Sequence, residues 1–354
     1  MLPDPRVEKY VDFYKEKGIR YKLMGWNRSG RIQQKENTIF FNLPSEFGSG
    51  AANAKSLLKF NKFIFSYLRR NRKNYTTIHA CDLDTVMPAL LCKFLYGKRL
   101  IFDVFDWYSH SRVMPNRIMK NIVKTCEWFA GRLSDRVIIC DSERRSQIPF
   151  KIKENKLIVL PNIPQYKGKP PIAEPNRTPD RLRIAYIGVF GAFRGLEDML
   201  EAVSKQPNVD FTIGGFGELQ TLVETYSSKF TNIHYIGKTS YDVSLQTMVS
   251  ADLICAMYYT AIPNHIYAAP NKFYEGLYLG RAILTTKGTI PGVKCEKEKV
   301  GFAIDEGERG IIDFFKNTSI DEIRRRGDNG LELWQRSYKN LWKNTIESKY
   351  YKSL

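Results

Sequence analysis

The second half of the chain alternates between short apolar segments and helical patterns, and this alternation restricts the fold more than any other feature. Apolar runs of strand type occupy residues 182–189, 209–213, 233–236, 253–257, 282–286 and 301–304. Patterns with helical spacing lie between them, at residues 196–204, 218–227, 241–249 and 271–279. Strands that alternate with helices form a parallel sheet covered on both faces. We therefore predict a doubly wound α/β domain in this half.

The first half of the chain carries a second series of the same kind. Strand-type runs occur at residues 21–25, 76–80, 100–105, 136–140 and 157–160. Helical patterns occur at residues 7–17, 54–70, 85–95 and 117–133. The same rule predicts a second α/β domain here.

A proline-rich stretch without helical or strand periodicity separates the two halves, which is typical of a linker. Its prolines are Pro164, Pro170, Pro171, Pro175 and Pro179. The predicted parts are a Rossmann-like domain over residues 1–163, a linker over 164–180, a second Rossmann-like domain over 181–330, and an amphipathic C-terminal helix over 331–354.

The bulk composition excludes several classes of protein. With 354 residues, 43% of them hydrophobic and 26% charged, the chain is globular and long enough for two cores. No apolar run approaches the roughly 18 to 20 residues of a membrane-spanning helix, and the N-terminus lacks the apolar region of a signal peptide. The six cysteines show no CxxC pair. They are expected to be core thiols in a reducing compartment, and no zinc site is expected.

The positive charge is concentrated in the first half of the chain. Of the net charge of +18, residues 1–175 contribute +16, from 32 Lys and Arg against 16 Asp and Glu. Such a surface suits an anionic membrane, a nucleic acid or a phosphorylated substrate. No RNP-like, zinc-finger or helix-turn-helix pattern is present, so a nucleic-acid partner is not expected.

The predicted helix at residues 54–70 mixes apolar and basic residues, which suits the surface of an anionic bilayer. Its apolar residues are Leu57, Leu58, Phe60, Phe63, Ile64, Phe65, Tyr67 and Leu68, and its cations are Lys55, Lys59, Lys62, Arg69 and Arg70. The alternative is a helix whose apolar side faces the core and whose basic side is solvated.

One helix in the second half combines a cation and a carboxylate near its start. Pro270 suits a helix start, and Asn271 and Lys272 follow where free N–H groups favour an anion. Glu275 lies one turn further on, and Gly280 is expected to end the helix. Lysine on phosphate and glutamate on ribose hydroxyls could hold a nucleotide. The alternative is a capped helix with a surface ion pair.

Together, the two domains, the linker and this helix resemble the GT-B glycosyltransferases, in particular the group 1 (family 4) retaining enzymes, over nearly the whole chain. The further stretches that resemble this family are Asp4-Pro5-Arg6-Val7, Gly25-Trp26-Asn27-Arg28, Gly48-Ser49-Gly50, Ile78-His79-Ala80-Cys81-Asp82, Tyr186-Ile187-Gly188, Arg194-Gly195-Leu196, Ile213-Gly214-Gly215-Phe216-Gly217 and Ala251-Asp252-Leu253. The implied fold is two doubly wound domains facing across a cleft. Because the chain enters a helix at once, we expect the first strand of the N-domain to be missing. Either the sequence is truncated or the first domain is irregular, and within the resemblance truncation is the expected reason.

The resemblance implies roles for the residues of the second domain. Glu275 would bind the ribose hydroxyls, while Lys272 and Arg194 would bind the diphosphate and stabilise the leaving nucleotide without a metal or other cofactor. Arg194 could instead be a solvated loop charge, and Asn271 could bind phosphate or sugar or merely cap the helix. The other residues expected on the donor side are Pro270, Gly188, Gly214, Gly215, Gly217, Lys238, Thr239 and Tyr267. The glycines could also belong to ordinary turns.

Two positions depart from the family pattern. Tyr267 stands where the family places an acidic residue that touches the donor sugar, so sugar selection is expected to differ. Phe105 stands at the position of a histidine that faces the reaction centre. Asp106 then becomes the polar catalytic candidate near the acceptor, or a cap of the next segment, and His110, Gly48 and Gly50 are expected on the acceptor side. His79, His234 and His265 are expected to be structural or on the surface.

The implied function is a retaining transferase that moves a sugar from a nucleotide-diphosphate sugar, with UDP favoured, to a polyprenyl-diphosphate-linked glycan. Such a reaction builds capsule, exopolysaccharide or O-antigen, and the enzyme would be cytoplasmic and peripheral to the inner face of the cell membrane. Two alternatives stay open. One is an inactive GT-B accessory protein, and the other is a UDP-sugar epimerase of the same fold, which would need more acidic and histidine residues in its cleft.

Overall fold

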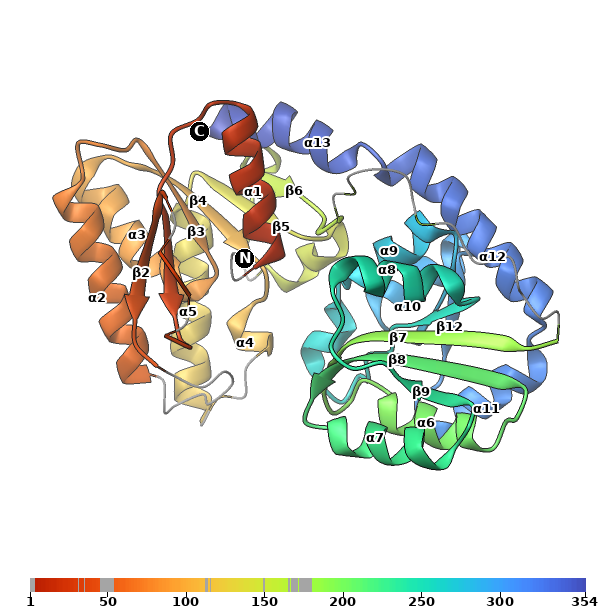
Figure 1. The fold of residues 1–354 in the computed structure, drawn as a ribbon. Helices are drawn as coiled ribbons and strands as arrows, with labels where there is room; N and C mark the ends of the chain where they lie inside the picture. The colour runs from red at the N-terminus through yellow and green to blue at the C-terminus, as the bar shows by residue number, and fades with distance from the viewer. Residues whose placement is uncertain are drawn as a thin grey trace. The chain divides into compact units, whose positions relative to one another are not determined.

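The computed structural model describes residues 4–30, 32–34, 36–44, 54–111, 114, 116–148, 150–164, 166, 171 and 180–354. The chain forms two compact units. Unit 1 comprises Met1–Pro161 with Asn344–Leu354, and unit 2 comprises Asn162–Lys343 (Figure 1). Every paired strand among the described residues runs parallel to its neighbour, and α-helices connect most of the strands. The predicted α/β class with two Rossmann-like domains is confirmed.

Unit 2 is built on a six-stranded sheet with the order β12-β11-β10-β7-β8-β9. Its strands are β7 (Leu182–Phe190), β8 (Val209–Gly217), β9 (Ile233–Tyr235), β10 (Leu253–Cys255), β11 (Ala282–Thr286) and β12 (Gly301–Ile304). The chain starts at β7, adds β8 and β9 on one side, and then crosses to β10 on the other side. In doubly wound sheets, ligands bind beyond the carboxyl ends of the two strands at such a reversal, which here are β7 and β10.

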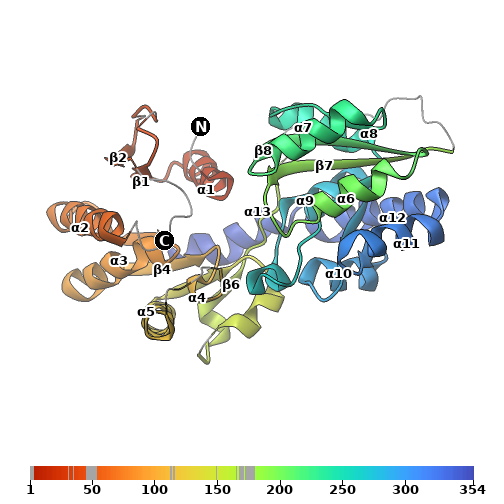
Figure 2. The same cartoon turned by 90° about the horizontal axis from the view of Figure 1, so that it is seen from below.

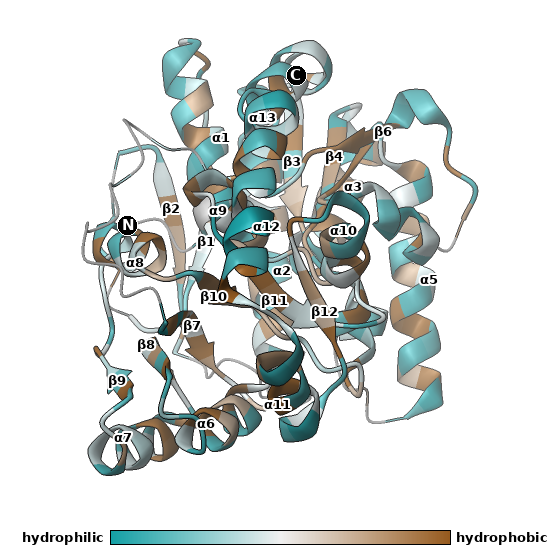
Figure 3. Ribbon diagram, turned by 90° about the vertical axis from the view of Figure 1, so that its right-hand side faces the viewer, coloured by the Kyte–Doolittle hydropathy of each residue, from teal (hydrophilic) through white to brown (hydrophobic). Residues whose placement is uncertain are grey.

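Helices cover both faces of the unit 2 sheet. They are α6 (Leu196–Ser204), α7 (Gln220–Lys229), α8 (Tyr241–Ser250), α9 (Asn271–Leu279), α10 (Ile290–Glu298), α11 (Gly307–Asn317) and α12 (Ile320–Leu333). One core packs α6, α7 and α11 against the sheet, and a second core packs α8 and α9 against its other face. The strands between these cores are apolar on both sides, as Figure 3 shows for β10 and β12.

The C-terminal helical segment begins earlier than predicted. It starts with α12 at Ile320, not at residue 331, and continues through a π-helical turn (Trp334–Tyr338), α13 (Leu341–Thr345), a second π-helical turn (Ile346–Tyr350) and a final turn (Tyr351–Ser353). Helices α10 and α11 were not predicted either.

Unit 1 has two parallel sheets. A four-stranded sheet has the order β3-β4-β5-β6, and β1 pairs with β2 in a sheet of their own. The strands are β1 (Leu23–Asn27), β2 (Thr38–Asn42), β3 (Thr77–Cys81), β4 (Arg99–Val104), β5 (Arg136–Ile139) and β6 (Leu157–Val159). The helices are α1 (Pro5–Glu16), α2 (Ala54–Arg70), α3 (Leu83–Tyr96), α4 (Tyr108–Ser111) and α5 (Arg117–Leu133), with short turns at Ser142–Gln147 and Glu154–Lys156.

Three helices of unit 1 lie side by side, with α3 between α2 and α5 (Figure 2). Helices α3 and α5 pack on the apolar face of the four-stranded sheet. Helix α2 buries Phe60, Ile64 and Leu68 against α3 and the β1-β2 pair. Of the two interpretations of the helix at residues 54–70, the core-facing one therefore describes its apolar side, and Leu58 is the exception, with 71% of its surface exposed.

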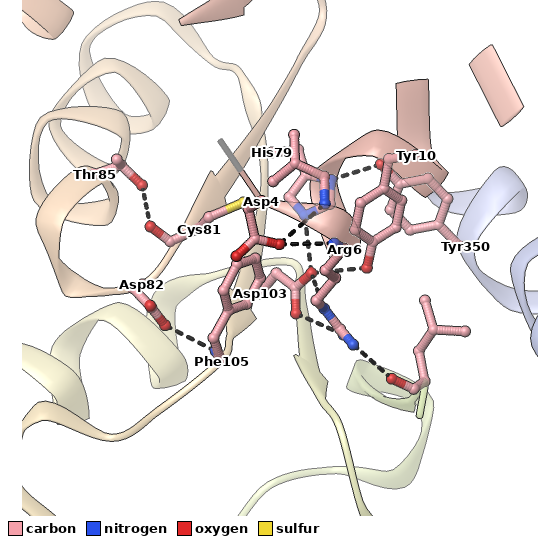
Figure 4. A network of polar contacts seen from close by, with 12 residues as sticks. Asp4, Arg6, Tyr10, His79, Cys81, Asp82, Thr85, Asp103, Phe105 and Tyr350 are labelled. Carbon is pink, nitrogen blue, oxygen red and sulfur yellow. Dashed lines mark hydrogen bonds and ion pairs between the residues drawn. The ribbon is translucent and has the colours of Figure 1, made fainter. Parts of the chain in front are cut away.

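The other face of the β3-β4 pair carries polar side chains that are nevertheless buried (Figure 4). The Arg6 guanidinium of α1 donates to both oxygens of Asp103 on β4, with distances of 3.0 and 2.9 Å, and to the carbonyl of Leu160. The Tyr10 hydroxyl donates to the same carboxylate at 2.7 Å. The His79 ring lies 3.4 Å from this carboxylate through Nε2 and 2.7 Å from the Tyr350 hydroxyl through Nδ1. This Arg6–Asp103 network fastens α1 and the C-terminal residues to the sheet.

Candidate functional site

The turn between β7 and α6 presents Arg194 at the carboxyl end of the unit 2 sheet. Phe193 has a φ of +61°, an uncommon value for a residue with a side chain. The carbonyl of Phe193 accepts a hydrogen bond of 2.9 Å from the backbone N–H of Tyr259, which follows β10. The Arg194 guanidinium lies 5.3 Å from the ring centre of Tyr258. The turn and the segment after β10 thus fix Arg194 beside the point where the strand order reverses.

Helix α9 presents Lys272 to the same place. Pro270 is the N-cap and has no side chain that could bond the first N–H groups, so the helix start keeps donors for a ligand. The Lys272 amine lies over the end of β7. A Cβ atom built on Gly188 of this strand would come within 2.7 Å of the Lys272 Nζ. Gly188 has a φ of +152°, which residues with side chains rarely adopt. A glycine at position 188 therefore makes room for the lysine.

The electrostatic setting of Lys272 favours an anion. Burial lowers the pKa of Lys272; the charge of Glu275 opposes this shift, and the positive charge of Arg194 adds to it. Two cations near the start of a helix, with one carboxylate close by, leave an excess of positive charge. A diphosphate would relieve the repulsion between Lys272 and Arg194.

Asn271 does not cap α9. Its amide oxygen is buried and has no hydrogen-bond partner in the described part of the chain. The structure therefore contradicts the capping role predicted for Asn271. Contact of the Asn271 amide with phosphate or sugar, the other predicted role, stays a prediction.

Glu275 lies one turn into α9, as predicted, and only 7% of its surface is exposed. Its neighbour is Tyr241, the first residue of α8. Burial raises the pKa of the Tyr241 hydroxyl, and the charge of Glu275 and a hydrogen bond to its carboxylate raise it further. A buried carboxylate with a hydroxyl donor beside it is suited to hold vicinal ribose hydroxyls.

The glycines predicted to form a turn, Gly214, Gly215 and Gly217, instead lie in β8, which extends to Gly217. Gly215 is paired with Gly188, and a Cβ built on Gly215 would come within 1.8 Å of the carbonyl oxygen of Gly188. The close approach of β7 and β8 requires glycine here. Contact of these glycines with a nucleotide stays a prediction.

The remaining donor-side predictions lie in segments that follow strands or precede α9 in unit 2. Lys238 follows β9, and its amine lies 4.7 Å from the ring centre of Phe216 at the end of β8. The Thr239 hydroxyl lies 2.8 Å from that of Ser244 in α8. Tyr267 ends the short turn Pro263–Tyr267 before α9. Lys238 is exposed and follows β9, the outermost strand on one side of the sheet. It therefore lies two strands away from β7, where the strand order reverses.

The acceptor-side predictions belong to unit 1. Asp106 follows β4 and accepts a hydrogen bond of 3.0 Å from the buried Arg144 guanidinium. His110 lies in α4, where burial lowers its pKa and the charges of Lys124 and Lys120 lower it further. Gly48 and Gly50 lie outside the described residues.

Asp82, at the end of β3, was not predicted as a site residue. Its φ is +57°, and its carboxylate accepts from the backbone N–H groups of Phe105 and Asp106 at 2.7 and 3.3 Å. Burial and the charge of Asp106 raise the pKa of Asp82 well above its ordinary value. The carboxylate fixes the segment after β4 that carries Asp106. Only the asparagine and aspartate preference for positive φ could have pointed to it.

Tyr241 and Tyr258 were also missed as site residues. Tyr241 is the first residue of a predicted helix and Tyr258 directly follows a predicted strand, but no local pattern distinguishes them from other tyrosines. Their role depends on Glu275 and Arg194, which are distant in the sequence.

One group of side chains has the spacing of metal ligands. The ligand atoms of His79, Cys81 and Asp103 lie within 4.8 Å of one another. The Asp103 carboxylate is already paired with Arg6, whose positive charge opposes a cation at this place. These residues do not fit a metal ion, and we assign the group to the network that fastens α1. All six cysteines are free thiols, four of them buried.

No family model matches the chain. It is 22% identical over 279 residues to the O-antigen biosynthesis glycosyltransferase WbnH of Escherichia coli, and the alignment covers 76% of each chain. Its fold is similar to that of Anabaena HepE, solved with UDP, with a TM-score of 0.63 and 12% identity over 94% of this chain and all of HepE. It is also similar to sucrose-phosphate synthase from Thermosynechococcus elongatus, with a TM-score of 0.68 and 13% identity over 97% of this chain and 92% of the synthase.

These likenesses show that the chain has the GT-B fold, in agreement with the predicted fold class. The match to WbnH supports a glycosyltransferase. No helix among the described residues is long and apolar enough to span a membrane.

Proposed function

We propose that the protein is a retaining glycosyltransferase that takes a sugar from a nucleotide-diphosphate sugar, with UDP as the nucleotide. The observation that carries this proposal is the set of charges at the reversal of the unit 2 sheet. The Lys272 amine lies beside Gly188, Arg194 is close enough for its charge to lower the pKa of Lys272, and Glu275 lies one turn away on the same helix as Lys272. HepE, which shares the fold, has been solved with UDP and with UDP-glucose.

In this proposal each residue has a separate task. Lys272, Arg194 and the start of α9 bind the diphosphate and stabilise the negative charge that develops on it as the sugar bond breaks. Glu275 accepts hydrogen bonds from the ribose hydroxyls, and Tyr241 holds its carboxylate in place. The two fixed cations supply the charge stabilisation, so we expect the reaction to need no metal. The leaving phosphate would assist the loss of the acceptor proton.

The acceptor in this proposal is a glycan on a polyprenyl diphosphate, in the synthesis of a cell-surface polysaccharide such as O-antigen, capsule or exopolysaccharide. The name of WbnH supports the polysaccharide class. The excess of positive charge in residues 1–175 supports an anionic acceptor and an association with the inner face of the cell membrane. Unit 1 would receive this acceptor near Asp106 and His110.

A second candidate is an accessory protein that binds a nucleotide but does not transfer sugar. The observations that favour it are Tyr267 and Phe105, which stand where the resembling family has an acidic residue and a histidine. Both candidates bind the nucleotide, and only the first transfers a sugar.

Thermal stabilisation of the full chain by UDP, GDP and ADP and by their sugars, each with and without EDTA, tests the proposal. We expect stabilisation by UDP and by one UDP-sugar that survives EDTA and disappears in Glu275→Ala. Hydrolysis or transfer of that sugar separates an enzyme from the accessory protein. If no nucleotide stabilises the protein, the proposed donor site is wrong.

A further inference from the structure

Large apolar side chains are exposed on two neighbouring helices of unit 1. On α5 they are Ile118, Met119, Ile122 and Phe129, and on α3 they are Leu91, Phe94 and Leu95. Ile118 has 73% of its surface exposed, and Phe94 has 61%. Scattered apolar residues are normal on a protein surface, but grouping on adjacent elements marks an interaction site.

The spacing of these residues places them on one side of each helix. Ile118 and Ile122 are four residues apart, Phe129 follows seven residues later, and Leu91 and Leu95 are again four residues apart, so each helix presents a stripe. The two helices pack against each other. In Figure 3, brown apolar segments alternate with teal polar ones along α5. We call the seven residues the α3–α5 apolar surface.

The charges on the helices that carry and flank this surface are mostly positive, and the acidic Asp135, which follows α5, is paired with Lys93 of α3 at 2.6 Å. Arg117, Lys120 and Lys124 are exposed on α5. The sole acidic residue of α5, Glu127, is buried and accepts a hydrogen bond from the backbone of Ser109. Helix α2, which packs on the other side of α3, contains five Lys and Arg residues and no acidic residue.

We propose that the α3–α5 apolar surface docks on an anionic lipid bilayer. A bilayer surface offers anionic headgroups for the lysines and an apolar layer for the isoleucine, phenylalanine and leucine side chains. A protein partner would need acidic groups around an apolar patch of matching shape, whereas a bilayer meets both requirements without a matching shape. The inference deepens the proposed function, on which it rests for the reason why the protein would dock.

The position of α4 gives the docking a consequence. Helix α4 follows β4, carries His110 and packs against α5. Lys120 and Lys124 lie close enough to His110 to affect its titration. Docking through α5 would therefore bring the acceptor-side end of unit 1 to the headgroup layer, where the diphosphate of a lipid-linked acceptor lies.

Flotation with vesicles of phosphatidylcholine alone and with added phosphatidylglycerol tests this inference. We expect binding to the anionic vesicles only. The double variant Ile118→Asp/Ile122→Asp should lower the fraction bound about tenfold or more, because it removes apolar contact and adds negative charge. Lys120→Glu/Lys124→Glu should have a similar effect.

Leu58→Asp on α2 is the matched control. Leu58 is as exposed as Ile118 but lies on the helix whose other apolar residues face the core. This variant should bind vesicles like the wild type.

The inference is overturned if the α5 variants also bind like the wild type, if the wild type binds neither vesicle, or if the wild type is a dimer that the isoleucine variant dissociates. Stabilisation by UDP, measured on the same variants, should be unchanged, so loss of nucleotide binding and loss of docking are separate results.

Discussion

Each of the two units holds a group of charged side chains near a sheet. In unit 1 the charges are paired with each other, whereas in unit 2 positive charge is in excess. In unit 1, Asp103 is fully buried, and the Arg6 guanidinium and the Tyr10 hydroxyl satisfy it. In unit 2, Lys272 lies near a second cation, Arg194, and its pKa is lowered. The first group is complete without a ligand, whereas the second has excess positive charge.

The difference teaches how to separate structural charges from functional ones in this chain. Burial of a charge costs free energy unless a partner compensates it. The Arg6–Asp103 network meets this cost within unit 1 and fastens α1 to the sheet. At the Lys272 site, Glu275 offsets part of the positive charge of Lys272 and Arg194, and we propose that an incoming anion supplies the rest. Each of the following predictions would break or sharpen this distinction.

The largest effect is expected for Asp103→Ala. Removal of the carboxylate leaves Arg6 buried without its partner, which should lower the free energy of unfolding by about 3–5 kcal/mol. Urea denaturation followed by circular dichroism measures this loss. The exposed Arg145, which pairs with Glu154, provides the control, and Arg145→Ala should leave the midpoint nearly unchanged. A midpoint for Asp103→Ala equal to that of the control would show that the network is not structural.

The same carboxylate predicts a dependence of stability on pH. Burial alone would raise the pKa of Asp103, but the Arg6 charge and the hydrogen bonds lower it to about 2. Because the folded-state pKa lies below the unfolded one of about 3.9, the stabilisation is fully present above about pH 4 and is lost as the pH falls towards 2. Asp103→Asn should flatten this part of the profile.

For Lys272→Ala we expect a smaller effect than for Asp103→Ala, and we expect it in enzymatic activity, not as a loss of stability. Loss of the cation should lower kcat/KM for sugar transfer by roughly 10²–10³-fold, as for other charge-stabilising donors. The free energy of unfolding should stay the same or rise, because the folded protein no longer holds a buried cation that Glu275 compensates only in part. Lys205→Ala, at an exposed lysine beyond the end of α6, is the control for both measurements. Loss of stability without loss of activity would contradict the assignment.

Lys272 should also make nucleotide binding dependent on pH. A bound diphosphate favours the protonated amine, so it raises the lowered pKa again. Affinity for UDP should therefore be constant at lower pH and decline as the pH rises through the pKa of the free protein. Isothermal titration across the alkaline range measures this decline. Lys272→Arg should reduce it, because arginine keeps its charge.

The smallest effect is expected for Tyr241→Phe. This change removes the hydroxyl beside Glu275, and the loss of one hydrogen bond should weaken UDP binding about three- to tenfold. Tyr226→Phe removes a similar hydroxyl that donates to Glu201 on the surface, away from the site. If Tyr241→Phe bound UDP as tightly as Tyr226→Phe does, Tyr241 would not position the carboxylate.

Local sequence patterns were sufficient for much of the fold. Helices α6 and α9 and strands β11 and β12 have the predicted boundaries, because their apolar periodicity and the residues that end them are local signals. Helix α12 gave no such signal, since it contains Gly327 and Gly330, which disfavour a helix. A Cβ on Gly327 would come within 2.6 Å of the carbonyl oxygen of Gly280. Packing against the end of α9 therefore requires a residue that local propensity rejects.

The sequence by itself determined the two α/β domains and the helix that carries Lys272 and Glu275, because strand and helix periods and a spacing of one turn are properties of short segments. Only the tertiary structure decided which charges meet. Lys272 reaches Arg194 and Gly188 because β7 and β10 are neighbours in the sheet, although more than 60 residues separate them. Arg6 and Asp103 meet across 97 positions. Such contacts depend on strand order and on the burial of both partners, and these arise only when the whole domain has folded.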